Sequence, residues 1–235
     1  MELAEYTLMD AAEERMWWYR ALHRRIVDAL AGVTGVVLDA GCGTGGLLAR
    51  LHAARPDLRL AGVEWAAAGA GRAAAKSGAL IARGSVNALP FAPASFDAAV
   101  AADVLCHAGV DPPVALAELR HALRPGGRLV VNMPAYTWLL SEHDRRVHNA
   151  RRCTAGELAT LLTAAGFVSV RVRYWNSLLL PLMIAQRKLR RTESSDVAPF
   201  PPWLDAILHG MTEIERRLPL SLPAGGSVLA TAERP

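Results

Sequence analysis

The feature that most constrains the fold is an apolar segment that runs directly into a turn with three nearly adjacent glycines. Residues 36–39 are expected to form a buried strand, Gly41, Gly43 and Gly45 form the turn, and a helix is expected at residues 46–54. Glycine lets the backbone adopt positive φ and approach a ligand closely. Open α/β sheets bind ligands at the carboxyl ends of their strands. The pattern predicts a ligand site at this turn, although a tight turn without a ligand would give the same pattern.

Further apolar segments alternate with stretches of helical character along the chain. Beyond the first strand, six more are expected at residues 58–64, 80–83, 96–101, 128–133, 167–174 and 227–232. Strands that alternate with helices form a parallel sheet covered by helices. The sequence therefore predicts an α/β protein with a Rossmann-like, seven-stranded, mostly parallel sheet that has helices on both faces.

Helical segments near both ends of the chain set the expected domain organisation. A helix is predicted at residues 13–30, and a longer helical stretch precedes the last strand. The expected parts of the chain are an N-terminal cap helix (1–35), an α/β core (36–174), a helical insertion or lid (175–226) and a final core strand (227–235). Two further helix starts are marked by capping residues, namely Asp111 before Pro112 and Thr154 three residues before Glu157.

Composition argues against several classes of protein. The net charge of +4 comes almost entirely from arginine, and the most concentrated basic run is at residues 187–191, so no nucleic-acid partner is expected. Cys42, Cys106 and Cys153 form no CxxC motif, which argues against a zinc site or a disulfide framework. The acidic N-terminus lacks the apolar stretch of a signal peptide, and no apolar run is long enough to span a bilayer. A cytoplasmic protein is therefore expected.

An acid and an aromatic residue follow the second predicted strand. Glu64 lies about 20 residues after the glycine turn, where an acid can accept both hydroxyl groups of a ribose. Trp65 comes next and could pack on an adenine ring. The alternatives are a solvated charge at the strand end and an aromatic residue of the core or surface.

Residues 36–45 resemble motif I of the class I S-adenosylmethionine-dependent methyltransferases, of the small-molecule type with a methyltransferase domain like families 11 and 25. Four later segments match that family in order and spacing, at residues 84–91, 95–97, 103–107 and 123–127. Ser85 stands where the family usually has an acid that contacts the adenine amino group. The turn also satisfies the GxGxxG pattern of oxidoreductases through Gly46, but no hydride-transfer residues accompany it.

The resemblance implies S-adenosylmethionine as the methyl donor and S-adenosylhomocysteine as the product. The core residues that it assigns to the cofactor are Asp39, Gly41, Cys42, Gly43, Glu64, Trp65, Ser85, Val86 and Ala101. Trp17, Tyr19 and Arg20 belong to an aromatic segment that resembles one in a methyltransferase subgroup, where a helix covers the cofactor and the arginine pairs with the methionine carboxylate. The alternative is a helix whose tryptophan face packs on the domain and whose arginine is solvated.

In the family, the region after the fifth strand borders the acceptor pocket. The residues interpreted as catalytic are Tyr136 as a wall of that pocket, His107, His143 or His148 as a general base, and Asp144 as the group that orients the base. A hydrogen-bonded loop with surface histidines is an equally weighted alternative, and a carboxylate acceptor would need no base. The spacing of these histidines is not a recurring ligand pattern, so no metal site is predicted.

The helical insertion leaves two interpretations open. Residues 174–185 are strongly apolar, and the basic run at residues 187–191 follows directly. This combination suits a membrane-surface contact, in which apolar side chains enter the interface and arginines meet anionic lipid. It also suits a lid over the acceptor pocket or a contact between two copies of the chain, and we favour these.

The predicted function is methyl transfer to an oxygen, nitrogen or carbon atom of a small molecule, with natural product biosynthesis as one setting. Two alternatives stay open. One is an enzyme of the same fold that binds the cofactor without methylating, and the other is a membrane-surface methyltransferase acting on a lipid-linked glycan or polyprenyl substrate. The protein is expected to be a monomer or homodimer whose partner is the acceptor molecule.

Overall fold

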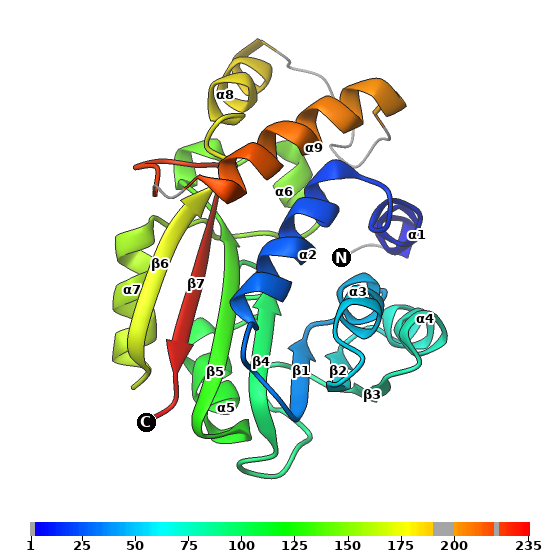
Figure 1. Cartoon of the computed structure of the whole chain (residues 1–235), viewed down its shortest axis with the longest axis vertical. Helices are drawn as coiled ribbons and strands as arrows, with labels where there is room; N and C mark the ends of the chain where they lie inside the picture. Colours follow the sequence, from blue (N-terminus) through cyan, green and yellow to red (C-terminus); the bar gives the residue numbers. More distant parts are fainter. Residues whose placement is uncertain (1–2, 190–199, 219–220) are drawn as a thin grey trace.

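A seven-stranded sheet organises the structure, a computed structural model in which residues 3–189, 200–218 and 221–235 are described (Figure 1). The strands are β1 (Val36–Ala40), β2 (Arg59–Glu64), β3 (Leu80–Arg83), β4 (Phe96–Ala102), β5 (Leu123–Pro134), β6 (Val168–Trp175) and β7 (Ser227–Glu233). They lie in the order β3-β2-β1-β4-β5-β7-β6. Neighbours from β3 to β5 pair in parallel, whereas β7 runs antiparallel to β5 and β6. The predicted mostly parallel sheet is confirmed.

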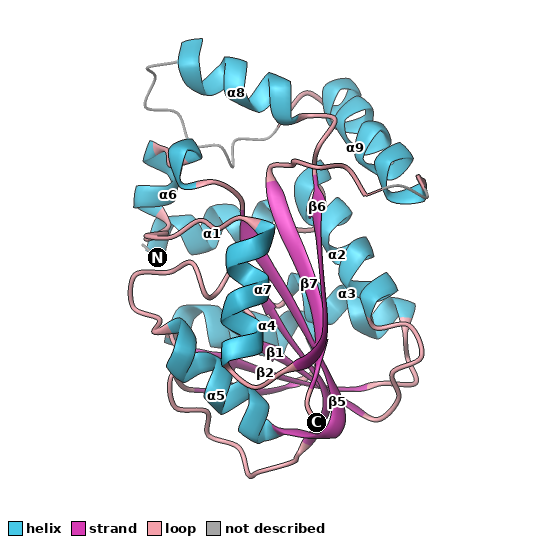
Figure 2. Cartoon of the chain, turned by 90° about the vertical axis from the view of Figure 1, so that its left-hand side faces the viewer, coloured by secondary structure: helices cyan, strands magenta, loops and turns pink. Residues whose placement is uncertain are grey.

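Helices cover both faces of the sheet, as predicted (Figure 2). One face packs on α5 and α7 through side chains such as Leu116 and Leu158, and the other packs on α2 and α3 through side chains such as Ile26 and Leu51. The helices are α1 (Leu3–Ala12), α2 (Trp17–Ala29), α3 (Gly46–Ala54), α4 (Ala67–Ser77), α5 (Pro112–Ala122), the 3-10 turn η1 (Thr137–Leu139), α6 (Glu142–Arg146), α7 (Ala155–Ala164), α8 (Leu180–Leu189) and α9 (Pro202–Arg217). None of these helices, within the described part of the chain, is long and apolar enough to cross a membrane.

The strand order reverses between β1 and β4, which are neighbours in the sheet. β1 connects through α3 to β2 on one side, while β4 leads through α5 to β5 on the other. In open α/β sheets, ligands bind at such a reversal, outside the carboxyl ends of the strands. The glycine turn follows β1 at this point, so the topology places the predicted ligand site where the fold favours one.

The prediction of one helix at residues 13–30 is wrong in its first part. In the structure a turn occupies residues 13–16, and helix α2 begins only at Trp17; the preceding helix α1 ends at Ala12. The side chain of Glu13, in this turn, is buried and accepts hydrogen bonds from Thr44 and Lys76. The two predicted caps are confirmed, since Asp111 accepts from the backbone of Val114 and Thr154 forms a capping box.

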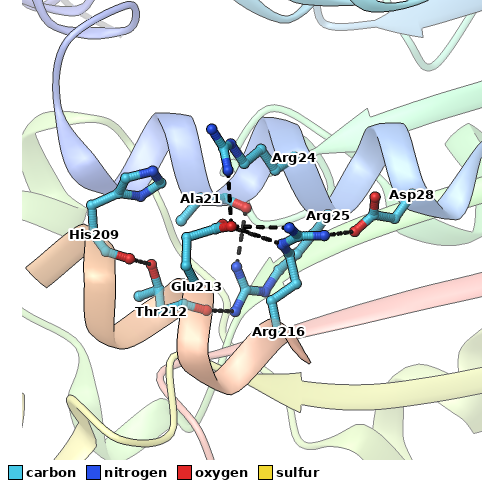
Figure 3. A network of polar contacts seen from close by, with 8 residues as sticks. All are labelled: Ala21, Arg24, Arg25, Asp28, His209, Thr212, Glu213 and Arg216. Carbon is cyan, nitrogen blue, oxygen red and sulfur yellow. Dashed lines mark hydrogen bonds and ion pairs between the residues drawn. The ribbon is translucent and has the colours of Figure 1, made fainter. Parts of the chain in front are cut away.

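Helix α9, which lies between β6 and β7 in the sequence, packs along α2 with charged contacts (Figure 3). Glu213 accepts from Arg24 and from Arg216, both at 2.9 Å. Arg216 also donates to Asp28 of α2 at 2.6 Å. One carboxylate of α9 thus joins guanidinium groups from both helices.

Arg25 makes the buried part of this interface. Its guanidinium donates to the carbonyl oxygen of Ala21 at 3.2 Å and to that of Thr212 at 2.7 Å, and it lies 4.7 Å from the ring centroid of Trp175. Backbone carbonyls and an aromatic face supply the partners that a buried guanidinium needs. The insertion is therefore joined to both α2 and the end of β6.

Candidate cofactor and acceptor site

The glycine turn after β1 has the backbone conformation that its sequence suggested. Gly41, Gly43 and Gly45 all have positive φ, at 84°, 55° and 89°. A Cβ on Gly45 would lie 2.7 Å from the Cα of Ala73, and a Cβ on Gly41 would lie 2.5 Å from Val104 Cγ2. Both positions need glycine for conformation and for space. The turn brings the start of α3 close to the ends of β1 and β4.

Glu64, the last residue of β2, turns its carboxylate toward this turn. Its Oε2 accepts from the backbone N–H of Gly43 at 3.0 Å. Its Oε1 accepts from the Tyr6 hydroxyl at 2.7 Å and from the backbone N–H of Ala66 at 2.9 Å. The side chain is buried, and the turn and the acid form one hydrogen-bonded unit.

Helix α1 lies over the glycine turn, which the sequence analysis missed. The Cε atom of Met9 would lie 2.7 Å from a Cβ on Gly43, and Glu13 accepts from Thr44 Oγ1 at 2.7 Å. Burial raises the pKa of Glu13, and the hydrogen bonds from Lys76 and Thr44 oppose that shift. The available signal was the spacing of Tyr6, Met9 and Glu13, which places them on one helix face.

The predicted orienting residue Asp144 has other partners than a histidine. Its two carboxylate oxygens each accept from Arg152 Nη2 at 2.8 Å, and Oδ2 also accepts from the backbone and hydroxyl of Ser141. Burial alone would raise the pKa of Asp144, but Arg152 and Ser141 hold it below its usual value. In this structure Asp144 therefore fixes the loop after β5.

The histidines interpreted as candidate bases lie in different surroundings. His107 is partly buried, and burial lowers its pKa despite hydrogen bonds to the backbone of Val147 and His148. His148 is exposed and has a φ of 59°. His143 belongs to α6, but its side chain lies outside the described residues. Their catalytic roles stay predictions.

Tyr136 stacks between two other aromatic rings. Its ring centroid lies 5.5 Å from that of Tyr174, with the planes 13° apart, and 5.6 Å from that of Trp138. Burial and the neighbouring Tyr174 raise the pKa of Tyr136 to about 12, so its hydroxyl is neutral at physiological pH. An aromatic wall beside the acceptor, the predicted role, is compatible with this stack.

A second acid, Asp103, was not predicted as a site residue. It follows β4, and its Oδ1 accepts from Asn132 Nδ2 at 2.9 Å. Asn132 in turn accepts from the indole N–H of Trp175 at 2.8 Å. The sequence showed Asp103 at the head of a family-like segment, but the hydrogen bonds join residues that are far apart in the chain.

A family model described as a methyltransferase domain matches residues 38–131 of this chain. That span contains the glycine turn, Glu64 and Asp103. Residues 38–131 therefore match a domain of the class I, S-adenosylmethionine-dependent methyltransferases. The family uses S-adenosylmethionine as its methyl donor.

Three curated proteins illustrate the relatives of this chain. An uncharacterized 37.1 kDa protein in transposon TN4556 of Streptomyces fradiae is 31% identical over 82% of this chain and 62% of its own length. An O-methyltransferase of Penicillium expansum is 32% identical over 58% of this chain and 53% of its own length. An O-methyltransferase of Aspergillus nomiae is 35% identical over 47% of this chain and 52% of its own length. The chain thus spans between half and two thirds of the length of these relatives.

Solved methyltransferase structures share the fold at low sequence identity. A methyltransferase of Thermotoga maritima, described as a possible histamine N-methyltransferase, has a TM-score of 0.67 and 21% identity, covering 99% of this chain and 96% of its own. The geranyl diphosphate C-methyltransferase of Streptomyces coelicolor, in complex with S-adenosylhomocysteine, has a TM-score of 0.65 and 17% identity, covering 92% of this chain and 76% of its own. These likenesses show that the chain shares their fold.

The residues around the turn fit an adenosyl group with a positively charged amino-acid part. Glu64 supplies carboxylate oxygens beside the glycine turn, and the neighbouring Trp65 is 74% exposed and accessible to an aromatic base. Burial, together with the charges of Glu13 and Glu64, raises the pKa of Asp39 to about 8. These crowded acids favour a ligand that carries an ammonium or sulfonium charge.

The remaining predicted cofactor residues differ in burial and in the groups that they could present to a cofactor. Cys42, Val86 and Ala101 are buried, and Ala101 belongs to the main apolar core, so only its backbone can face a ligand. Burial raises the pKa of the Cys42 thiol, which is therefore neutral. Ser85 Oγ accepts from the backbone N–H of Asn87 at 3.1 Å, and its own hydroxyl proton is left for another acceptor.

The aromatic segment of α2 packs against the insertion at residues 175–226. Arg20, predicted to pair with the methionine carboxylate, instead pairs with Asp205 of α9 at 2.5 Å. Trp17 is buried in a cluster with Leu179 and Leu208, and its backbone N–H donates to Asp205 at 2.7 Å. The carboxylate-clamp role of Arg20 stays a prediction, and it would require the pair with Asp205 to open.

Tyr19, the third residue of that segment, packs against other aromatic rings of α2. Its ring packs edge-on against Trp18, with ring centroids 5.1 Å apart, and lies 6.1 Å from the ring of His23.

Among the described side chains, no group of three or more His, Cys, Asp or Glu residues is arranged to hold a metal ion.

Proposed function

We propose that this protein binds S-adenosylmethionine at the glycine turn and transfers its methyl group to a small-molecule acceptor. The observation that carries the proposal is the unit formed by the turn and Glu64, in which the carboxylate accepts from Gly43 at the switch point of the sheet. When bound, the cofactor supplies a methyl group on a positively charged sulfur, which is an activated leaving group. The protein then has to hold the acceptor close and aligned, which can supply much of the rate enhancement.

Oxygen methylation is the acceptor chemistry that the relatives favour, because two of the curated relatives are O-methyltransferases. The aromatic stack of Tyr136, Tyr174 and Trp138 offers a wall for a flat acceptor. We further propose that residues 175–226, with α8 and α9, cover the acceptor and that the protein acts in the cytoplasm in natural product biosynthesis. The membrane-surface alternative depends on residues 187–191, whose side chains lie outside the described part of the chain.

Binding and transfer can be tested separately. We expect calorimetry to show that the protein binds both S-adenosylmethionine and S-adenosylhomocysteine. We also expect the tritiated methyl group to move to at least one member of a panel of phenols, alcohols and amines. Binding without transfer to any acceptor would favour the alternative of a non-methylating enzyme, and no binding at all would contradict the proposal.

Tyr6 is expected to compete with the ribose for Glu64. A carboxylate has about four acceptor positions, and three donors already occupy those of Glu64. A ribose that donates two hydroxyl groups to Glu64 must therefore displace Tyr6. Because that hydrogen bond is worth about 1 kcal/mol, Tyr6→Phe should strengthen S-adenosylhomocysteine binding roughly fivefold, as measured by calorimetry.

The control for this change is Tyr174→Phe, which removes a hydroxyl that accepts from Ala155 and lies away from the glycine turn. The Tyr174→Phe variant should bind S-adenosylhomocysteine with the affinity of the wild type. Weaker binding by Tyr6→Phe would mean that the tyrosine hydroxyl contacts the cofactor instead of competing with it.

A further inference from the structure

Asp103 has a backbone conformation that residues other than glycine rarely adopt. Its φ is 54°, in the left-handed region, and its N–H donates to the carbonyl oxygen of Asn132 at 3.0 Å. The next residue, Val104, packs so closely on Gly41 that a Cβ there would lie 2.5 Å from it. Strained backbone of this kind persists where the surrounding structure imposes it, and it is common at active sites. Asp103 is thereby held beside the glycine turn, between the ends of β1 and β5.

Two buried side chains fix the direction of the Asp103 carboxylate. The indole N–H of Trp175 can only donate, and it donates to Asn132 Oδ1 at 2.8 Å. The amide of Asn132 must then present its Nδ2 on the other side, where it donates to Asp103 Oδ1 at 2.9 Å. Asn132 and Trp175 are both buried, so this arrangement is protected from water.

The charged groups that act on Asp103 are Arg152 and Asp144. Burial raises the pKa of the Asp103 carboxyl to about 7, the hydrogen bond from Asn132 and the charge of Arg152 lower it, and the charge of Asp144 raises it. Arg152 is already engaged by both oxygens of Asp144, so it neutralises that acid in addition to acting on Asp103. A carboxyl that titrates near neutral pH is suited to accept a proton and release it again.

The other titratable neighbours of Asp103 are neutral, and its carboxylate has room for a further partner. Cys106 and Cys153 both lie near Asp103, and burial raises the pKa of both thiols, to about 12 for Cys153. Asp103 itself is partly exposed, and Asn132 occupies its Oδ1. Because a carboxylate has about four acceptor positions, Oδ2 can accept from a bound molecule.

We propose that Asp103 is the catalytic residue that receives the proton of the methyl acceptor, with Asn132 and Trp175 as positioning residues. The inference rests on the proposed methyl transfer and narrows the acceptor to a molecule with a hydroxyl or amine group. In the step, the O–H or N–H bond breaks and its proton moves to Asp103 Oδ2. The electron pair of the acceptor atom forms the bond to the methyl carbon, and the carbon–sulfur bond breaks with its electron pair left on sulfur.

A titration of the carboxyl group tests this role without an acceptor. In protein labelled with 13C at aspartate, we expect two carboxyl resonances that titrate near neutral pH, that of Asp39 near 8 and that of Asp103 near 7. Only the resonance with the midpoint near pH 7 should disappear in Asp103→Asn. The resonance should persist in the matched control Asp111→Asn, in which the cap of α5 lies outside the site. Trp175→Phe should raise the midpoint, because the Asn132 amide that donates to Asp103 is no longer held in place. A midpoint below about pH 5, near the value of an unperturbed aspartate, would overturn the proposal.

Methyl transfer to defined probes gives the second readout. With catechol, tyramine and benzoate as acceptors, we expect transfer to catechol or tyramine with a kcat that rises with pH around neutrality. Asp103→Asn should lower this kcat at least about 100-fold, the range of general base catalysis, and should leave S-adenosylhomocysteine affinity unchanged. If His107→Gln removed the pH dependence and Asp103→Asn did not, the proton would go to His107 and the inference would be overturned.

The outcomes separate this inference from the proposed function. Wild-type protein that does not bind S-adenosylhomocysteine would overturn the proposed function and the inference with it. Normal binding together with a fully active Asp103→Asn, or with transfer to benzoate alone, would overturn only the inference. If none of the three probes is methylated, the carboxyl titration of Asp103 alone decides whether the inference stands.

Discussion

Replacing Glu64 by alanine should weaken S-adenosylhomocysteine binding by about two orders of magnitude. The carboxylate is the charged acceptor beside the glycine turn, and hydrogen bonds to a charged group are worth roughly 1.5–3 kcal/mol each. Loss of about 3 kcal/mol corresponds to roughly 100-fold in the dissociation constant. Isothermal titration calorimetry measures the change directly. The affinity of Glu64→Gln for S-adenosylhomocysteine should lie between those of the wild type and Glu64→Ala, because glutamine keeps an acceptor oxygen but loses the charge.

A carboxylate in a comparable local setting provides the control for Glu64. Glu118 of α5 also accepts from a backbone N–H, that of Leu89, but it lies away from the glycine turn. Glu118→Ala should bind the cofactor like the wild type. If both variants lost affinity equally, or if Glu64→Ala bound normally and remained folded by circular dichroism, the ribose role of Glu64 would be rejected.

Replacing Asp144 by alanine should lower the free energy of unfolding by about 3–5 kcal/mol. The side chains of Asp144 and Arg152 are only 1% and 5% exposed, and removing one partner leaves the other charge buried and unpaired. For a chain of this size, the change corresponds to a fall in Tm of roughly 10 °C. Thermal unfolding at neutral pH checks it. Replacing both members by Asp144→Leu and Arg152→Met should restore much of the loss.

The exposed pair on the same helix serves as the control. Glu142 and Arg145 form an ion pair with side chains that are 58% and 79% exposed, and such pairs contribute little. Glu142→Ala should therefore change Tm by no more than a degree or two. A comparable loss in both variants would show that the helix itself, and not the buried pair, is responsible.

The contribution of Asp144 should also depend on pH in a defined direction. Its pKa in the folded protein is held below the usual value, so the folded state binds its proton less readily than the unfolded chain does. The stabilisation is therefore complete above the unfolded pKa of about 3.9 and is lost as the pH falls through the lower folded value. The difference in stability between wild type and Asp144→Ala should be constant from neutral pH to about pH 5 and should shrink below that.

The parts of the fold that depend on local pattern could be predicted from the sequence. The strand, glycine turn and helix at residues 36–54 were predicted nearly to the residue, because an apolar run, positive-φ glycines and a helical segment follow each other directly. Glu64 could be predicted as a site residue because its distance from the turn along the chain reflects the geometry of a β-α-β unit.

Features that depend on distant contacts could not be predicted. The hydrogen bond between Tyr6 and Glu64 joins residues that are 58 positions apart. Arg20 was predicted to pair with a ligand because its partner in the structure, Asp205, is 185 residues further along the chain. The left-handed backbone of Asp103 arises where β4 meets β5 and the glycine turn, which no local pattern encodes. Asp144 was linked to histidines by proximity in sequence, whereas its partner Arg152 is set by the path of the loop.

The acid that satisfies the first backbone N–H of α2 belongs to a different segment of the chain. Met16, at the N-cap of α2, makes no side-chain cap, and Asp205 of α9 accepts from Trp17 in its place. A chimera that received the insertion of a relative would lose this acceptor and would also lose Glu213 as the partner of Arg24. Engineering of acceptor specificity by segment exchange should therefore transplant α2 and α9 as one matched pair.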